Sequence, residues 1–163
     1  MAQRGERTAR LAGALWLIVI LAGVLSVVTQ SELPRVAFAA SQFGGVCYLG
    51  VTVLLYELFE PVSTSHSRFA AFCGLAGVAS GAALSLVRSD PPTQGFTVAM
   101  MFGAQIITIG YLILRSTLIP RILGALLMLG GASYAINSFA NFLSPVLGGK
   151  LMPLIVPIAI VAE

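Results

Sequence analysis

The sequence predicts an all-α integral membrane protein, a bundle of five full transmembrane helices and a short sixth segment. Three observations predict this class. Hydrophobic residues form 58% of the 163-residue chain and charged residues only 9%, and the mean hydropathy is +0.96. A soluble domain carries about 25% charged residues because its surface must be hydrated. Most of this protein's surface must therefore face an apolar medium.

Charged residues, prolines and turn residues divide the chain into six apolar runs. About 20 residues cross a hydrocarbon core of about 30 Å as a helix, which also satisfies every backbone polar group there. The sixth run is short and contains Pro153 and Pro157, so it is half a span, an interfacial or re-entrant piece, or a cut helix. We predict one transmembrane domain, residues 1–163, with spans at 11–28, 36–59, 69–87, 95–114, 122–143 and 151–162.

The basic residues predict the orientation of these spans. The first run is long enough to span, so we interpret it as a retained helix and not as a cleaved signal peptide. With six crossings, one side of the membrane collects Arg4, Arg7, Arg10, Arg68, Arg115 and Arg121, and the other collects Arg35, Arg88 and Lys150. The richer side is expected to be the cytosol, which places the N-terminus inside. The chain has no basic patch with interleaved aromatic residues, so we expect no nucleic-acid partner.

Polar residues inside the apolar runs are few and predict contacts between helices. Asn137 and Asn141 lie four residues apart, on one face of a helix with Tyr134 and Ser138. Such a stripe must face other helices or a cavity. It either hydrogen-bonds neighbouring helices or lines a ligand pocket. The candidate ligand-binding residues are Gln42, Gln105, Tyr134, Asn137, Ser138 and Asn141.

Ionisable residues are absent from the middle of the spans. Glu57, Glu60, Arg68 and Arg115 are predicted to form an interfacial salt-bridged cluster, with a proton or cation site as the alternative. The single histidine, His66, is predicted in a cytosolic loop. One histidine and no Cys-x-x-Cys pair supply no ligand set for zinc, di-iron or haem. We expect no catalytic residues, no metal and no cofactor, with bound lipid as the one exception.

Small residues within the runs predict close helix packing. Gly77 and Gly81 form a Gly-x-x-x-Gly pair, a spacing that lets membrane helices approach each other closely. We predict that the pair packs within the bundle, with a homo-oligomer interface as the alternative.

Three segments resemble an uncharacterised bacterial membrane family, domain of unknown function 4386. They are residues 10–13 with the apolar run that follows, residues 54–62, and residues 110–139. The resemblance covers nearly the whole chain and implies a six-helix fold in the bacterial inner (plasma) membrane, but no activity. Family members often carry a histidine where Gln105 stands and an acid where Asn137 stands. Their last helix usually runs beyond the point where this chain ends, which implies a C-terminal truncation.

The absence of catalytic motifs favours a non-enzymatic role. We expect an accessory or structural subunit of a membrane assembly, or a homo-oligomer, with the lipid bilayer, other membrane subunits or itself as partners. The alternative is binding or transport of a small apolar or lipid-like ligand in the polar-lined pocket. A membrane enzyme is the third hypothesis, with only Glu57, Glu60, His66 and Asp90 available as a general base.

Overall fold

Five long helices make up almost all of the described structure. The computed structural model describes residues 2–87, 91–117, 119–144, 146, 149–151 and 153. Within these ranges there is no strand, and each helix is long and apolar enough to cross a membrane. The chain is therefore an all-α, multi-pass membrane protein. Its helices are α1 (Ala2–Thr29), α2 (Pro34–Phe59), α3 (Thr64–Val87), α4 (Pro91–Arg115) and α5 (Arg121–Leu143).

Each helix contains one of the first five apolar runs and extends beyond it. The extension is largest at the starts of α1 and α3, where polar residues form the first turns. Hydropathy marks the part of a helix that suits lipid, whereas polar residues can continue the same helix into water. His66 therefore lies in the first turn of α3, and its predicted position in a loop is wrong. The predicted sixth span, 151–162, falls outside the described residues except for 151 and 153, and Asp90 also falls outside them.

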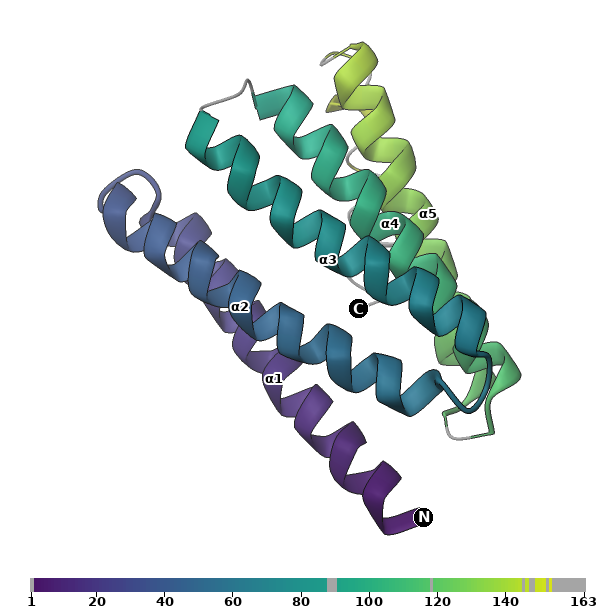
Figure 1. Cartoon of the computed structure of the whole chain (residues 1–163). Helices are drawn as coiled ribbons and strands as arrows, with labels where there is room; N and C mark the ends of the chain where they lie inside the picture. Colours follow the sequence, from purple (N-terminus) through teal and green to yellow (C-terminus); the bar gives the residue numbers. More distant parts are fainter. Residues whose placement is uncertain are drawn as a thin grey trace. The chain divides into compact units, whose positions relative to one another are not determined.

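The helices divide into two compact units, Met1–Leu58 (unit 1) and Phe59–Glu163 (unit 2). Unit 1 is an antiparallel pair of α1 and α2 (Figure 1). A Cβ atom at Gly44 would lie 3.3 Å from the Cβ of Ala22, and one at Gly50 would lie 3.2 Å from Cδ1 of Leu15. The small residues of α2 therefore seat side chains of α1, as close packing between membrane helices requires.

In unit 2, α3 packs against α4 through a row of small residues. A Cβ atom at Gly77 would lie 2.8 Å from Cε1 of Phe102, and one at Gly81 would lie 3.4 Å from Cγ2 of Val98. The large side chains of α4 thus fill the space beside the two glycines of α3, which have no side chain. Steps of three and four residues keep the whole row on one face of α3. The row consists of Ser67, Ala70, Gly74, Gly77 and Gly81.

On α4, a second face meets α5 through glycine on both sides. A Cβ atom at Gly110 would lie 2.6 Å from the carbonyl oxygen of Gly124, and one at Gly124 would lie 2.7 Å from the carbonyl oxygen of Gly110. Two turns away, a Cβ atom at Gly131 would lie 3.0 Å from the carbonyl oxygen of Gly103. The backbones touch directly at both levels, so no side chain larger than hydrogen fits. We call these four residues the glycine contact.

Helix α4 lies between α3 and α5 (Figure 1) and is the most buried of the five spanning helices. At 100° per residue, the face of α4 that meets α3 and the face that meets α5 are roughly 130° apart. With neighbouring axes about 9 Å apart, that angle separates α3 and α5 by roughly 16 Å. Among the described residues of unit 2, α3, α4 and α5 therefore form an open layer.

Replacing one glycine of the glycine contact should destabilise unit 2. Gly110→Ala puts a methyl group against the backbone of α5, and the rigid neighbour cannot give way. We expect a loss of about 1–3 kcal/mol, the usual cost of overpacking, seen as a lower midpoint of thermal unfolding in detergent. The free thiols of Cys47 and Cys73 allow unfolding to be followed with a thiol-reactive dye.

Gly95→Ala is the matched control, because Gly95 lies on the same helix and a Cβ atom there meets nothing within 4 Å. Equal midpoints for Gly110→Ala and Gly95→Ala would contradict a tight glycine contact.

Candidate functional site

The end of unit 2 where α3 begins and α4 ends carries a stack of three side chains. The rings of His66 and Tyr111 lie 5.1 Å apart between centroids, tilted by 43°. The guanidinium carbon of Arg115 lies 4.9 Å from the centroid of the same Tyr111 ring, within the range of a cation–π interaction. The Oγ of Ser63 lies 2.8 Å from Nδ1 of His66. We call Ser63, His66, Tyr111 and Arg115 the tyrosine stack.

Beside the tyrosine stack, Ser67 carries an unsatisfied hydroxyl group. Other hydroxyl groups in unit 2 donate to carbonyl oxygens of their own helix, such as Thr108 Oγ1 to Ala104 at 2.7 Å and Ser133 Oγ to Leu129 at 2.8 Å. Ser67 is 1% exposed, and among the residues described here its Oγ is the one buried side-chain polar atom without a hydrogen-bond partner. A buried polar group in that state costs about 1–3 kcal/mol.

Gln105 is the most buried polar residue at the middle of α4, with 1% of its surface exposed. Its amide lies flat against the backbone of α3, because a Cβ atom at Gly74 would meet Nε2 at 2.5 Å and Oε1 at 2.7 Å. Only glycine at position 74 leaves room for this amide. Gln105 is therefore part of the contact between α3 and α4.

The polar stripe of α5 is not joined to Gln105. Gly103 lies opposite Gly131, so Gln105 is level with residue 129 of α5, and Asn137 lies about eight residues or 12 Å farther along the axis. Gln105 also faces α3, on the side of α4 turned away from α5. Within unit 2, Gln105 and the stripe around Asn137 therefore do not line one pocket, and Gln42 belongs to α2 of unit 1.

Within the stripe, the two asparagines bind each other. Nδ2 of Asn141 donates to the main-chain oxygen of Asn137 at 2.9 Å and lies 3.2 Å from its Oδ1. Tyr134 is 44% exposed, and Ser138 is half-buried. Part of the hydrogen-bonding capacity that suggested a ligand pocket is therefore satisfied within α5.

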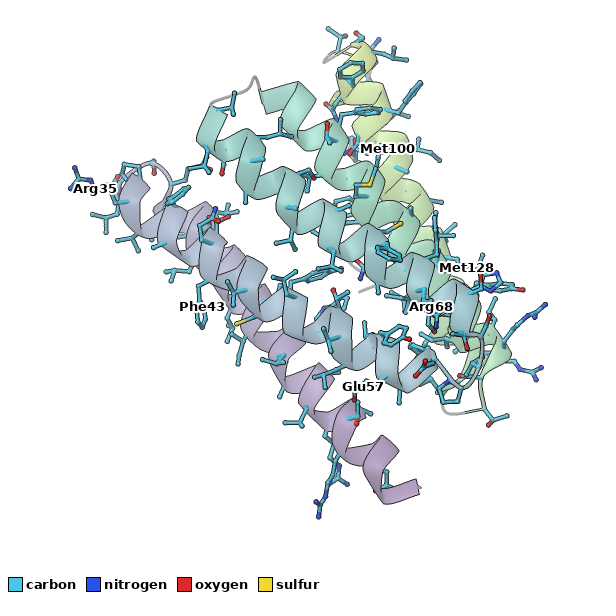
Figure 2. The ribbon with its side chains drawn as sticks, viewed as in Figure 1. Arg35, Phe43, Glu57, Arg68, Met100 and Met128 are labelled. Carbon is cyan, nitrogen blue, oxygen red and sulfur yellow. The ribbon has the colours of Figure 1, made fainter. Side chains whose placement is uncertain are left out.

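The predicted charge cluster is distributed over both units. Glu60, Arg68 and Arg115 are exposed at the end of unit 2 that carries the tyrosine stack, and Figure 2 shows Arg68 near the start of α3. Glu57 is exposed on α2, in unit 1. Arg115 is held over Tyr111, a contact that the charge pattern alone does not reveal.

The tyrosine stack offers hydrogen-bond donors. Among them, no group of three His, Cys, Asp or Glu side chains could hold a metal ion. The chemistry available at the tyrosine stack is that of guanidinium, imidazole, phenol and hydroxyl groups. These groups suit the recognition of an anion.

Sequence reasoning did not single out Tyr111, Ser63 or Ser67. Tyr111 and Arg115 are four residues apart, a spacing that puts them on one helix face and could have indicated their contact. Nothing in the sequence indicates that His66 reaches Tyr111, because that pairing depends on the register of α3 against α4.

The fold defines a class, that of multi-pass helical membrane proteins. The family model described as a domain of unknown function (DUF4386) matches residues 80–163, just over half of the chain, and the protein belongs to this family. The match begins within α3 and includes all of α4 and α5, and so contains the glycine contact. No curated protein and no solved structure matches the chain.

Gly74 and Gln105 should be energetically coupled. Gly74→Ala forces the methyl group into the buried amide, and we expect a lower unfolding midpoint. Gln105→Ala leaves a gap and should also destabilise. The double variant should be more stable than the sum of the single effects predicts, by about 0.5–3 kcal/mol. Additive effects in this cycle of thermal unfolding would mean that the two residues do not touch.

Proposed function

We propose that this protein is a non-enzymatic membrane component that works in an assembly, either with copies of itself or as an accessory subunit of another membrane protein. The open layer that α3, α4 and α5 form supports this role. The proposal is carried by one observation, the unpartnered glycines of α1.

Helix α1 is the most exposed of the five spanning helices, and it contains two glycines with open space beside them. Cβ atoms at Gly13 and Gly23 would meet nothing within 4 Å. Glycine in a helix costs about 0.5–1 kcal/mol relative to alanine. In a membrane helix it gains where it allows another backbone to come close. On α2, Gly44 and Gly50 serve that purpose against α1. Within unit 1 the open glycines of α1 do not meet α2, so they fit a further helix, which we propose comes from another chain.

Bulky residues at these glycines should disrupt the assembly. We expect Gly13→Leu and Gly23→Leu to shift the protein extracted in mild detergent towards the monomer, or to release a copurifying subunit, by at least fivefold in the ratio of the two species. Native mass spectrometry measures both effects. Ala125→Leu, at an exposed position of α5, is the control for added bulk.

A wild-type protein that is always monomeric and free of partners would contradict the proposed role. An assembly unchanged in both glycine variants would show that α1 is not its interface.

We also propose that the N-terminus lies in the cytosol of a bacterial cell. The starts of α1, α3 and α5 and the ends of α2 and α4 share one side of the membrane if each helix crosses it. Arg7, Arg10, Arg68, Arg115 and Arg121 lie at those ends, while Arg35 lies at the connection between α1 and α2 (Figure 2). This distribution agrees with retention of the basic side in the cytosol.

Cysteine labelling tests this orientation. In a chain with Cys47 and Cys73 replaced by alanine, Glu32→Cys should react with a membrane-impermeant maleimide in intact spheroplasts. Ser65→Cys should react only after permeabilisation. Both positions are exposed and lie in a connection or a first helical turn. The reverse pattern would place the N-terminus outside.

A further inference from the structure

We propose that the end of unit 2 where α3 begins and α4 ends binds the phosphate headgroup of an anionic phospholipid, through Arg115, His66 and Ser67. This site is separate from the proposed assembly role, because all of its residues belong to one copy of the chain and none lies on α1.

The tyrosine stack holds two hydrogen-bond donors in positions that suit an anion. Arg115 rests on the Tyr111 ring, and a guanidinium group stacked on an aromatic ring keeps its N–H donors at the edge of its plane. His66 is fixed by the same ring and by Ser63 at Nδ1, so its Nε2 remains available to a ligand. Both side chains are exposed, and fixing them beforehand lowers the entropy lost on binding.

Ser67 provides an independent indication of a ligand. It follows His66 in the sequence and lies on the face of α3 that meets α4. Its buried Oγ is unpartnered, unlike the Oγ of Ser116 at the end of α4, which donates to the main-chain oxygen of Ile113 at 3.1 Å. A phosphate oxygen accepting from Ser67 would remove the cost of this unsatisfied hydroxyl.

The surrounding charge favours an anion. Arg68 and Arg121 are exposed at the same end of unit 2 as Arg115, and among the described residues of this unit Glu60 is the acidic one there. Within that described part, three guanidinium groups against one carboxylate leave this end positive. Exposed arginines near an anionic membrane surface add to this attraction.

The apolar surface beside the site favours a lipid over a free phosphate ion. Phe69 follows His66 by three residues, so the two are neighbours on the surface of α3, and it is 54% exposed. It lies about one turn farther into the spanning segment. A headgroup at the tyrosine stack would therefore place an acyl chain along this ring, where a soluble phosphate gains nothing.

Native mass spectrometry of the full chain in detergent tests the site, with dioleoyl phosphatidylglycerol, dioleoyl phosphatidylcholine and inorganic phosphate as separate probes. We expect phosphatidylglycerol to bind at least tenfold more tightly than phosphatidylcholine. Arg115→Gln and His66→Ala should each weaken phosphatidylglycerol binding about fivefold to tenfold. Arg35→Gln removes the same charge from unit 1 and should leave binding unchanged.

Ser67→Ala separates a ligand contact from a structural role. Because the hydroxyl has no partner in the protein, its removal should leave the unfolding midpoint of lipid-free protein unchanged or raise it. The same variant should weaken phosphatidylglycerol binding severalfold. A Ser67→Ala protein that binds the lipid as the wild type does would overturn the assignment of Ser67.

Three other outcomes would overturn the proposal. Equal binding of the two lipids would show that the site does not select an anion. An equal loss in Arg35→Gln and Arg115→Gln would reduce the effect to overall charge. Inorganic phosphate that binds as tightly as phosphatidylglycerol and displaces it would assign the site to a soluble anion. Unfolding midpoints of Arg115→Gln and His66→Ala that match the wild type control for damage to the fold.

Discussion

The direct contact between the backbones of α4 and α5 is the constraint on which the rest of unit 2 depends. Two glycines on each helix, seven residues apart, put main chain against main chain at two levels. Two such levels fix both the register and the rotation of α4. Its opposite side then presents Phe102 and Gln105 to the small residues of α3. Lipid tails are as apolar as leucine, so membrane helices gain little from burying apolar surface and rely on packing of this kind.

The rotation of α4 also builds the tyrosine stack. Tyr111 follows Gly110, so the residue that contacts α5 determines where the next side chain points, about 100° around the helix. On that side of α4, away from Phe102 and Gln105, the Tyr111 ring contacts His66 at the start of α3, and Arg115, one turn later, covers the same ring. The polar end of the unit is thus a consequence of packing deeper in the membrane, and its donors are held by the fold and not by a loop.

The membrane class and the existence of five helices could be predicted from the sequence, because apolar runs of spanning length have few other solutions in lipid. The sequence also indicated that Gly77 and Gly81 would pack against a neighbour, and they face α4. The sequence could not show which helix Gln105 contacts, because periodicity assigns a residue to a helix face but does not say which helix lies opposite. The sequence alone therefore placed Gln105 and Asn137 in one pocket, although the two residues lie at different heights along the helix axes and face different directions. The seven-residue spacing of the glycines on α4 and α5 indicates the tight helix contact better than the Gly-x-x-x-Gly pair of α3 does. The spacing alone does not show which glycines meet, because the pairing of Gly103 with Gly131 depends on the antiparallel register of the two helices.

The short link between α4 and α5 has a consequence for how the protein forms during synthesis. Residues 116–120 connect the two helices, and short loops close at little entropic cost. Until residue 131 has been made, however, Gly103 has no partner. Helix α3 is available earlier, so α4 should first associate with α3 and acquire its final rotation only when α5 inserts. Its early pairing with α3 is then a provisional step that α5 corrects or locks.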